Sequence, residues 1–289
     1  MEFRTIVDIE PSEWQIEPCE RMLFVGSCFA DNIGKRFQDE KFRAVVNPYG
    51  VMYNPASIMH TVSRLVSDNA MPFKEDEPGT AVFTLGTNHV YILKETGEIV
   101  DNCRKRPQYL FHEKELTVDE CAKYLLQAIK TIHYRFPLVR FILTVSPIRY
   151  RKYGYHGSQL SKATLLLAVQ QTCKAAQGSG EEPKVNYFPS YEIMNDELRD
   201  YRFYKPDMLH PSDQAVEYIY EQLGETYFSE ATKEFLKEWK PVKEALAHRP
   251  FHPEAEEYKR FMERTIEKAE ALKRKYPTLE WQTSSASNR

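Results

Sequence analysis

The chain has 289 residues, of which 42% are hydrophobic, and a formal net charge of -3. A chain of this length and composition can bury a large core, so we expect one domain of more than ~200 residues with an appendage. The charge is nearly balanced and no basic stripe is interleaved with aromatic residues, which argues against nucleic-acid binding. The five cysteines lack the spacing of a metal site or a disulfide framework, and we expect reduced thiols.

Targeting and cofactor signals are missing from the sequence. The first five residues include the charged Glu2 and Arg4, and no run approaches the ~18 consecutive apolar residues of a membrane span. The sequence has no dinucleotide-binding, P-loop or zinc-protease motif. We therefore expect a cytoplasmic protein without a membrane span, with no cofactor and no metal.

Strand-like and helix-like segments alternate along the first 229 residues. Five strands separated by helices predict a parallel sheet covered on both faces, that is, a three-layer α/β/α sandwich. The Thr117–Glu120 pair has the capping-box pattern and predicts a helix start, as do Asn54 and Ser212. The expected strands are residues 22–26, 42–46, 81–85, 141–145 and 184–188, and residues 90–93 and 98–100 are expected to form a hairpin.

The composition changes beyond residue 229. Residues 230–281 are charged and follow a helical pattern, which predicts a helical C-terminal extension to a catalytic domain of residues 1–229. The apolar side of these helices is expected to pack on the core or on a second subunit, so a homodimer through them is one expectation. Residues 282–289 are polar, and we expect a frayed tail.

A candidate nucleophile follows the first predicted strand. Gly26 and Ser27 form a tight turn between this strand and a helix, which puts Ser27 at the carboxyl end of a strand and near the positive end of a helix. Cys28 is a competing nucleophile. Successive side chains on a helix diverge by about 100°, so only one of the two can face a common histidine. We expect Cys28 to pack against the sheet.

A candidate base and its orienting carboxylate lie near the other end of the domain. His210 precedes the helix capped by Ser212, and Asp207 lies three residues upstream of it. A serine hydroxyl is a weak nucleophile at neutral pH unless an imidazole takes its proton and a carboxylate orients that imidazole. Ser27, His210 and Asp207 are therefore the predicted catalytic residues.

The segments around Ser27 and around Asp207 and His210, with three segments between them along the chain, resemble the GSCFA family, which is similar to the SGNH (GDSL-like) hydrolases. The matching segments span about residues 20–225, and such an ordered set is far more specific than any single motif. The resemblance implies an SGNH-like, flavodoxin-like fold and a serine-dependent ester hydrolase. The matching segments are Gly26–Ala30, Asn47–Gly50 with Asn54–Pro55, Ser146–Arg149, Ser161–Thr164 and Asp207–Ser212.

The resemblance also implies an oxyanion hole. In the SGNH pattern it is made by the nucleophile's own N–H, a glycine N–H and an asparagine side chain, which match Ser27, Gly50 and Asn88. His89 stands where the pattern has an aspartate, so an alternative is that Asn88 is only a turn residue. His89 itself could be a second base, a substrate contact or a loop residue.

Ser146 and Arg149 are further candidates for substrate binding. They follow the most apolar strand, and the aromatic, basic segment 149–157 after them could form a lid over an anionic or sugar-like substrate, or a solvated surface loop. We expect an esterase acting on a small-molecule or carbohydrate ester. The alternatives are an O-acyltransferase with the same triad and a ligand-binding module without turnover.

Overall fold

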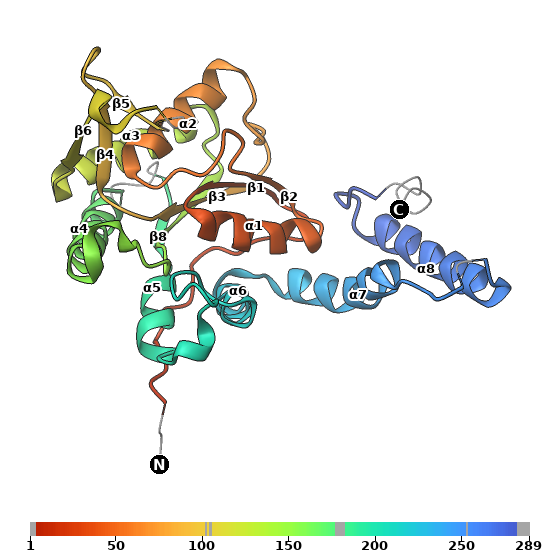
Figure 1. Cartoon of the computed structure of the whole chain (residues 1–289). Helices are drawn as coiled ribbons and strands as arrows, with labels where there is room; N and C mark the ends of the chain where they lie inside the picture. Colours follow the sequence, from red (N-terminus) through yellow and green to blue (C-terminus); the bar gives the residue numbers. More distant parts are fainter. Residues whose placement is uncertain (1–3, 102, 104–105, 177–182, 253, 282–289) are drawn as a thin grey trace.

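The computed structural model describes residues 4–101, 103, 106–176, 183–252 and 254–281, so the predicted tail 282–289 lies outside the described residues. At its centre is a five-stranded sheet in which every pair of neighbours is parallel (Figure 1). The predicted α/β class with five parallel strands is confirmed. In sheet order the strands are β2 (Arg43–Val46), β1 (Arg21–Gly26), β3 (Gly79–Leu85), β7 (Val139–Val145) and β8 (Val185–Tyr187).

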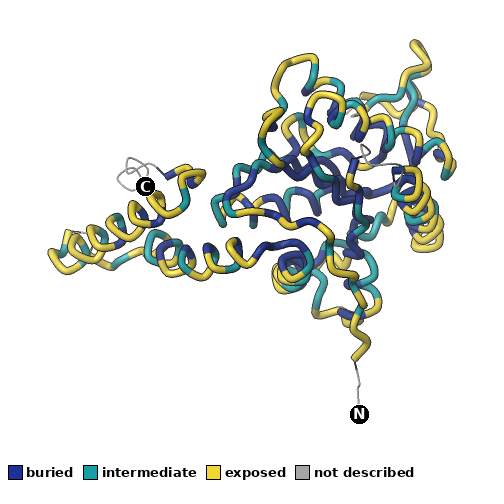
Figure 2. Tube along the Cα trace, turned by 180° about the vertical axis from the view of Figure 1, so that it is seen from behind, coloured by how far each residue is buried: buried dark blue, intermediate teal, exposed yellow. Residues whose placement is uncertain are grey.

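Helices cover both faces of this sheet. The side chains of β3 and β7 are almost all buried, which agrees with a sheet sandwiched between two helical layers (Figure 2). One layer consists of α2 (Pro55–Ser67), α3 (Val118–Arg135) and α4 (Gly154–Ala176). The other consists of α1 (Cys28–Asp39) and α6 (Asp213–Tyr227).

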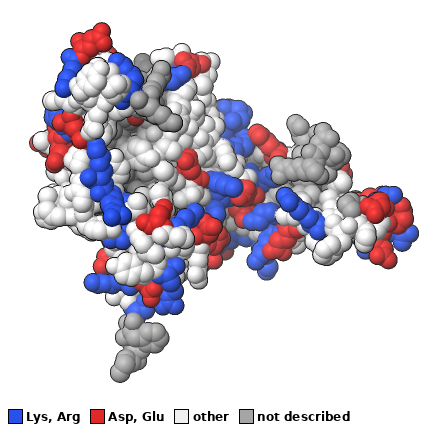
Figure 3. Space-filling view, viewed as in Figure 1, with Lys and Arg blue, Asp and Glu red and all other residues white. Residues whose placement is uncertain are grey.

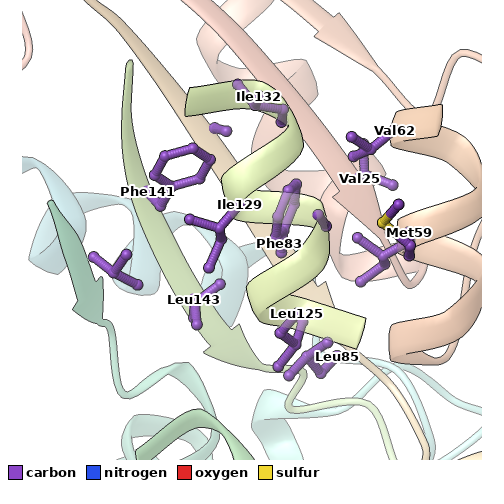
Figure 4. Close-up of a cluster of buried hydrophobic side chains, with 14 of the residues drawn as sticks. Val25, Met59, Val62, Phe83, Leu85, Leu125, Ile129, Ile132, Phe141 and Leu143 are labelled. Carbon is purple, nitrogen blue, oxygen red and sulfur yellow. The ribbon is translucent and has the colours of Figure 1, made fainter. Parts of the chain in front are cut away.

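The larger of the two central clusters lies under α2 and α3. Phe83 of β3 and Phe141 of β7 are fully buried, with ring centroids 6.3 Å apart, and Ile129 of α3 packs into the same cluster (Figure 4). On the opposite face, Phe24 of β1 meets Phe37 of α1 with ring centroids 5.1 Å apart. These clusters hold the helices on the sheet by burying apolar area on both sides.

The predicted helix starts are confirmed at their capping residues. Asn54 accepts a hydrogen bond from Ser57 N–H at 2.9 Å and begins α2, and Thr117 and Glu120 form a reciprocal capping box at α3. Ser212 caps α6 in the same way. Each cap satisfies a backbone donor that the helix leaves unpaired.

A second, antiparallel sheet begins within residues 86–89, which match the third block of the SGNH pattern and which we call the third block. The predicted hairpin is present as β4 (His89–Leu93) and β5 (Ile99–Val100), but a third strand, β6 (Phe111–Glu115), pairs with β4 on its other side. Four of the five residues of β6 are exposed, and its sequence lacks the apolar alternation that indicates a strand. The backbone pairing with β4 therefore stabilises β6 as a strand, although its own sequence does not favour one.

Short irregular helices join the larger elements. The segment between β8 and α6 holds α5 (Ser190–Glu192), a single π turn η3 (Ile193–Glu197) and the 3-10 turn η4 (Tyr201–Phe203). Two further 3-10 turns are η1 (Gln108–Leu110) and η2 (Arg151–Tyr153). Residues 149–157 are not the single loop that the sequence predicted, because α4 begins at Gly154 and their second half is the first turn of this helix. A role as a lid stays a prediction.

The C-terminal extension is a pair of helices that projects from the sheet domain (Figures 1 and 2). It consists of α7 (Glu230–Ala247) and α8 (Glu256–Lys275), which pack on one another through a small core that includes Trp239 and Ala269. Cys19, from the start of the sheet domain, is buried in the same core. A homodimer through these helices stays a prediction, and none of the described helices is long and apolar enough to cross a membrane.

Candidate active site

The junction between β1 and α1 has a backbone that only glycine accommodates. Gly26 has φ +150°, and a Cβ there would lie 2.2 Å from the carbonyl oxygen of Thr84 on β3. Its N–H donates to Asn47 Oδ1 at 2.9 Å, and Asn47 in turn has a left-handed φ of 40°. Two of the family-like motifs therefore cooperate to shape one turn at the carboxyl edge of the sheet.

Ser27 lies in this turn and is held on two sides. Its hydroxyl accepts a hydrogen bond from Phe29 N–H at 3.2 Å, so it caps α1, and it is bonded to Thr84 Oγ1 at 3.1 Å. Ser27 is only 1% exposed. The predicted position at the edge of the sheet and at a helix start is therefore present, but the hydroxyl is buried and doubly hydrogen-bonded.

Cys28 faces outward, contrary to the prediction that it packs against the sheet. It is the first residue of α1 and is partly exposed, and its Sγ lies 3.5 Å from the hydroxyl of Tyr53. The sheet-facing side of α1 carries Phe29 and Ile33 instead. Because adjacent helical positions diverge by about 100°, the burial of Phe29 turns Cys28 away from the sheet.

Asp207 and His210 form the predicted pair. His210 Nδ1 lies 2.6 Å from Asp207 Oδ2, while Asp207 Oδ1 accepts the backbone N–H groups of Leu209 at 2.8 Å and His210 at 3.0 Å. The backbone N–H of His210, followed by that of Leu209 and the imidazole, lowers the pKa of Asp207 to about 2. The ionised carboxylate therefore accepts a hydrogen bond from Nδ1–H, which keeps this proton on Nδ1 and leaves Nε2 to accept a second proton.

The loop that carries this pair is tied to the central sheet. Arg149, just beyond β7, donates its backbone N–H to Leu209 O at 3.0 Å and its guanidinium to Met208 O at 3.1 Å. The pair therefore belongs to the same carboxyl edge as Ser27. Among the described residues, the side-chain hydrogen bonds of Ser27 go to Thr84 and Phe29 and that of His210 to Asp207, so contact between Ser27 and His210 stays a prediction.

Each predicted oxyanion donor is bonded to a protein carbonyl. Ser27 N–H donates to Thr84 O at 3.0 Å, Gly50 N–H donates to Asn47 O at 2.8 Å, and the amide of Asn88 donates to Leu116 O at 2.8 Å. These groups can stabilise an oxyanion only after changing partner. The sequence analysis did not consider the N–H of Cys28 as an oxyanion donor. Cys28 is the first residue of α1, and the first N–H of a helix has no partner within the helix, so this group can donate to a ligand.

The third block lies directly against the nucleophile turn. Gly86 and Thr87 both donate their N–H groups to Tyr53 O, at 2.9 and 2.8 Å. A Cβ on Gly86 would lie 3.1 Å from this oxygen and 3.5 Å from Ser27 Cβ. The absence of a side chain at Gly86 thus lets the third block approach Ser27.

Lys162 is a site residue that the sequence interpretation gave no role. It lies on α4, is fully buried, and donates to Gly86 O at 2.8 Å and Ser146 O at 2.7 Å. Burial lowers the pKa of its ammonium to about 7. Lys162 lies three residues before Leu165 and seven before Val169, on the same side of the helix. A lysine on the apolar side of a predicted helix was the signal that could have predicted its burial.

Two of the predicted substrate contacts are not available at a surface. Ser146 is fully buried and its hydroxyl accepts Ile148 N–H at 3.3 Å, because the end of β7 lies inside the fold, so its contact with a substrate stays a prediction. His89 is 7% exposed and stacks on Tyr153 with ring centroids 3.6 Å apart. Burial also lowers the pKa of His89, which keeps its ring neutral. Arg149 is half-buried and does line a cavity.

A comparison with protein families identifies the chain. The GSCFA family profile matches residues 21–77 and 76–223, and a GSCFA C-terminal domain profile matches residues 239–286. The chain belongs to the GSCFA family. This confirms the resemblance drawn from the motifs, and the second match includes the second half of α7 and all of α8.

Solved structures with a similar fold are distant. A carbohydrate esterase family 3 protein from Talaromyces cellulolyticus is 12% identical, with 75% of this chain and 98% of that chain covered and a TM-score of 0.41. An acetyl-xylooligosaccharide esterase mutant from Geobacillus Stearmophilus is 13% identical, with 73% of this chain and 95% of that chain covered and a TM-score of 0.42. An aryl esterase from M. smegmatis is 10% identical, with 71% of this chain and 97% of that chain covered and a TM-score of 0.41. A comparison with curated proteins gave no match.

The described part of the chain offers no metal centre. No group of three or more His, Cys, Asp or Glu side chains within it is arranged to hold a metal ion. Positive and negative side chains are interspersed over the face shown in Figure 3. The described groups at the carboxyl edge of the sheet include a histidine–carboxylate pair, a hydroxyl, a thiol and the N-terminus of α1.

Proposed function

We propose that this GSCFA protein is an ester hydrolase that uses a covalent acyl-enzyme. The observation that carries the proposal is the pair of Asp207 and His210, whose 2.6 Å hydrogen bond is reinforced by two backbone N–H groups on the same carboxylate. A carboxylate held in this way stabilises the imidazolium that forms during catalysis and keeps Nε2 ready to accept a proton. A purely structural helix-entry histidine would not require such an arrangement.

In the proposed reaction, Ser27 Oγ attacks the ester carbonyl while His210 Nε2 takes the hydroxyl proton. The tetrahedral oxyanion develops at the N-terminus of α1, where the N–H of Cys28 and the helix dipole favour negative charge. Collapse breaks the bond to the alcohol, which leaves with the proton from His210. Water, deprotonated by His210, then cleaves the acyl group from Ser27 and restores the enzyme.

A thiol nucleophile is the second candidate. Ser27 is 1% exposed and must give up its bond to Thr84 before it can attack, whereas Cys28 is partly exposed at the start of α1. Thiols are intrinsically better nucleophiles than hydroxyls. In this alternative, Cys28 Sγ forms the acyl-enzyme with the same base.

The acceptor of the acyl group sets the reaction class. Water as the acceptor makes an esterase, for example one that deacylates a carbohydrate, and a second hydroxyl makes an O-acyltransferase. A ligand-binding module without turnover is the remaining alternative, and the engagement of all three predicted oxyanion donors favours it. Hydrolysis of 4-nitrophenyl acetate, with and without an added alcohol, separates these alternatives.

The decisive experiment compares variants of the two adjacent residues. Ser27→Gly removes the hydroxyl at a cost of only a few tenths of a kcal/mol to the helix cap, whereas Ser27→Ala loses about 0.5–2 kcal/mol, so the glycine variant is the cleaner test. We expect Ser27→Gly to abolish fluorophosphonate labelling and ester hydrolysis, and Cys28→Ala to retain both. The reverse result assigns attack to Cys28. Full activity in His210→Ala would refute the hydrolase proposal for either nucleophile.

A further inference from the structure

A small cavity of about 270 Å³ lies beside the loop of Asp207 and His210. Its lining includes Arg149 and Arg199, and we call it the arginine pocket. We propose that the arginine pocket binds an anionic group, a carboxylate or a phosphate, carried by the ester substrate. The proposal rests on the proposed function, because it names the substrate class of the same site. The volume is below the ~300–1,000 Å³ of pockets for drug-sized ligands and fits a small group.

The pocket and the catalytic pair share one hydrogen-bonded unit. Arg149 donates to Leu209 O and Met208 O, the two residues between Asp207 and His210. Tyr204, which also lines the pocket, forms an isolated antiparallel bridge with Pro211, and Lys205 N–H donates to His210 O at 2.8 Å. A group held in the pocket is therefore adjacent to the loop that positions the base.

The charges of the lining favour an anion. Within the described residues, neither Arg149 nor Arg199 forms an ion pair with a carboxylate, and the single acidic lining residue, Asp200, is already paired with Arg202 at 3.0 Å. Arg202 also donates its backbone N–H to Asp200 at 2.9 Å. Two arginines of the lining, Arg149 and Arg199, are thus without a carboxylate partner among the described residues. Guanidinium groups bind carboxylates and phosphates through charge-assisted hydrogen bonds.

The guanidinium of Arg149 is held in place before any ligand arrives. It lies 4.3 Å from the centre of the Tyr155 ring and 5.4 Å from that of Tyr204, and one of its nitrogens donates to Met208 O. Arginine has five N–H donors, so most remain for a ligand. Preorganisation of this kind lowers the entropy that binding costs.

Part of the pocket lining is apolar, beside the polar Gln159 and Asn195. Met194 of the π turn and Leu198 beyond it line the cavity and are almost fully buried. The best occupant is therefore a short apolar chain that ends in an anion, such as the acyl part of a dicarboxylate half-ester, or a small phosphorylated alcohol. Both share the anionic terminus, and the experiment separates them.

Binding is measured by calorimetric titration of the full chain with succinate and, separately, with inorganic phosphate, at constant ionic strength. We expect saturable binding of at least one of them, weakened about tenfold or more by Arg199→Gln, since a hydrogen bond to a charged group contributes about 1.5–3 kcal/mol. Arg264→Gln removes the same charge from an exposed position on α8 and is the matched control, with an expected change below about twofold. Arg199 makes no bond to the catalytic loop among the described contacts, so it is a cleaner test than Arg149.

The result identifies the anion and can overturn the proposal. Preference for succinate assigns a carboxylate, and preference for phosphate assigns a phosphorylated substrate. No saturable binding, or equal weakening by Arg264→Gln, refutes the arginine pocket. The same chain is then assayed with 4-nitrophenyl butyrate and with mono-4-nitrophenyl glutarate. Hydrolysis of both esters without anion binding refutes the arginine pocket and leaves the hydrolase proposal standing. Anion binding without hydrolysis of any ester refutes the hydrolase proposal and leaves the pocket as an anion-binding site.

Discussion

The ammonium group of Lys162 lies 2.8 Å from the carbonyl oxygen of Gly86 and 2.7 Å from that of Ser146. These two carbonyls follow β3 and β7, which are adjacent strands of the central sheet, so the lysine on α4 joins the third block to the end of β7. Nζ also lies 5.9 Å from the ring centre of Tyr191. No carboxylate in the described part of the chain is paired with it.

The first prediction concerns the pH dependence of stability. Burial lowers the folded-state pKa of Lys162 from 10.5 to about 7, so between these values the unfolded chain binds more protons and the free energy of unfolding rises with pH. Below pH 7 the cost of burying the charge is fully present. Between pH 7 and pH 9, the free energy of unfolding should rise by about 2 kcal/mol more in the wild type than in Lys162→Met. Urea unfolding at both pH values measures this, with the exposed Lys174→Met on the same helix as the control. Equal gains in wild type and Lys162→Met would refute it.

The second prediction tests the pair of Asp207 and His210. In Asp207→Asn the side-chain oxygen can still accept the backbone N–H groups, but an amide donor facing Nδ1 favours the tautomer with its proton on Nε2. The base is then lost, and kcat/KM for 4-nitrophenyl acetate should fall by about 10⁴-fold with little change in far-UV circular dichroism. Retention of activity within tenfold would mean that His210 is not the general base.

The third prediction concerns Asn88. Its side-chain N–H group donates to Leu116 O inside the fold, so Asn88→Ala should leave a buried carbonyl unpaired and lower the free energy of unfolding by about 1–3 kcal/mol. The expected change in kcat is below about threefold. An oxyanion donor would behave in the opposite way, with kcat lowered about 10²-fold or more and KM nearly constant. Steady-state kinetics and urea unfolding of the same variant distinguish the two roles.

The fourth prediction addresses the C-terminal extension. Trp239 is 1% exposed, lies 6.2 Å from the ring of Trp281 and donates its indole N–H to Asp39 O at 3.3 Å. Trp239→Ala should destabilise the extension by about 3–5 kcal/mol. Limited proteolysis should then cut the extension at protease concentrations that leave wild type intact. Phe251→Ala, at a fully exposed position, is the control and should behave like wild type.

Features that depend on nearby residues could be predicted from the sequence. The capping box of Thr117 and Glu120 predicted the start of α3, and the apolar run of residues 141–145 predicted β7, because both signals act within a few residues. The hydrogen bond between Asp207 and His210 was predictable for the same reason, since the partners are three residues apart. The strand β6 was missed, because only its pairing with β4 makes a strand of polar residues.

The sequence by itself determined the positions of the five sheet strands along the chain, the helix starts and the pairing of His210 with its carboxylate. Only the tertiary structure decided which groups of the candidate site are accessible and which are already bonded. Ser27 is buried and hydrogen-bonded to Thr84, which is 57 residues away in the sequence. Gly86, one of the two hydrogen-bond partners of Lys162, is 76 residues away from it. No local pattern encodes such contacts, since they form only when parallel strands and the helices above them pack together.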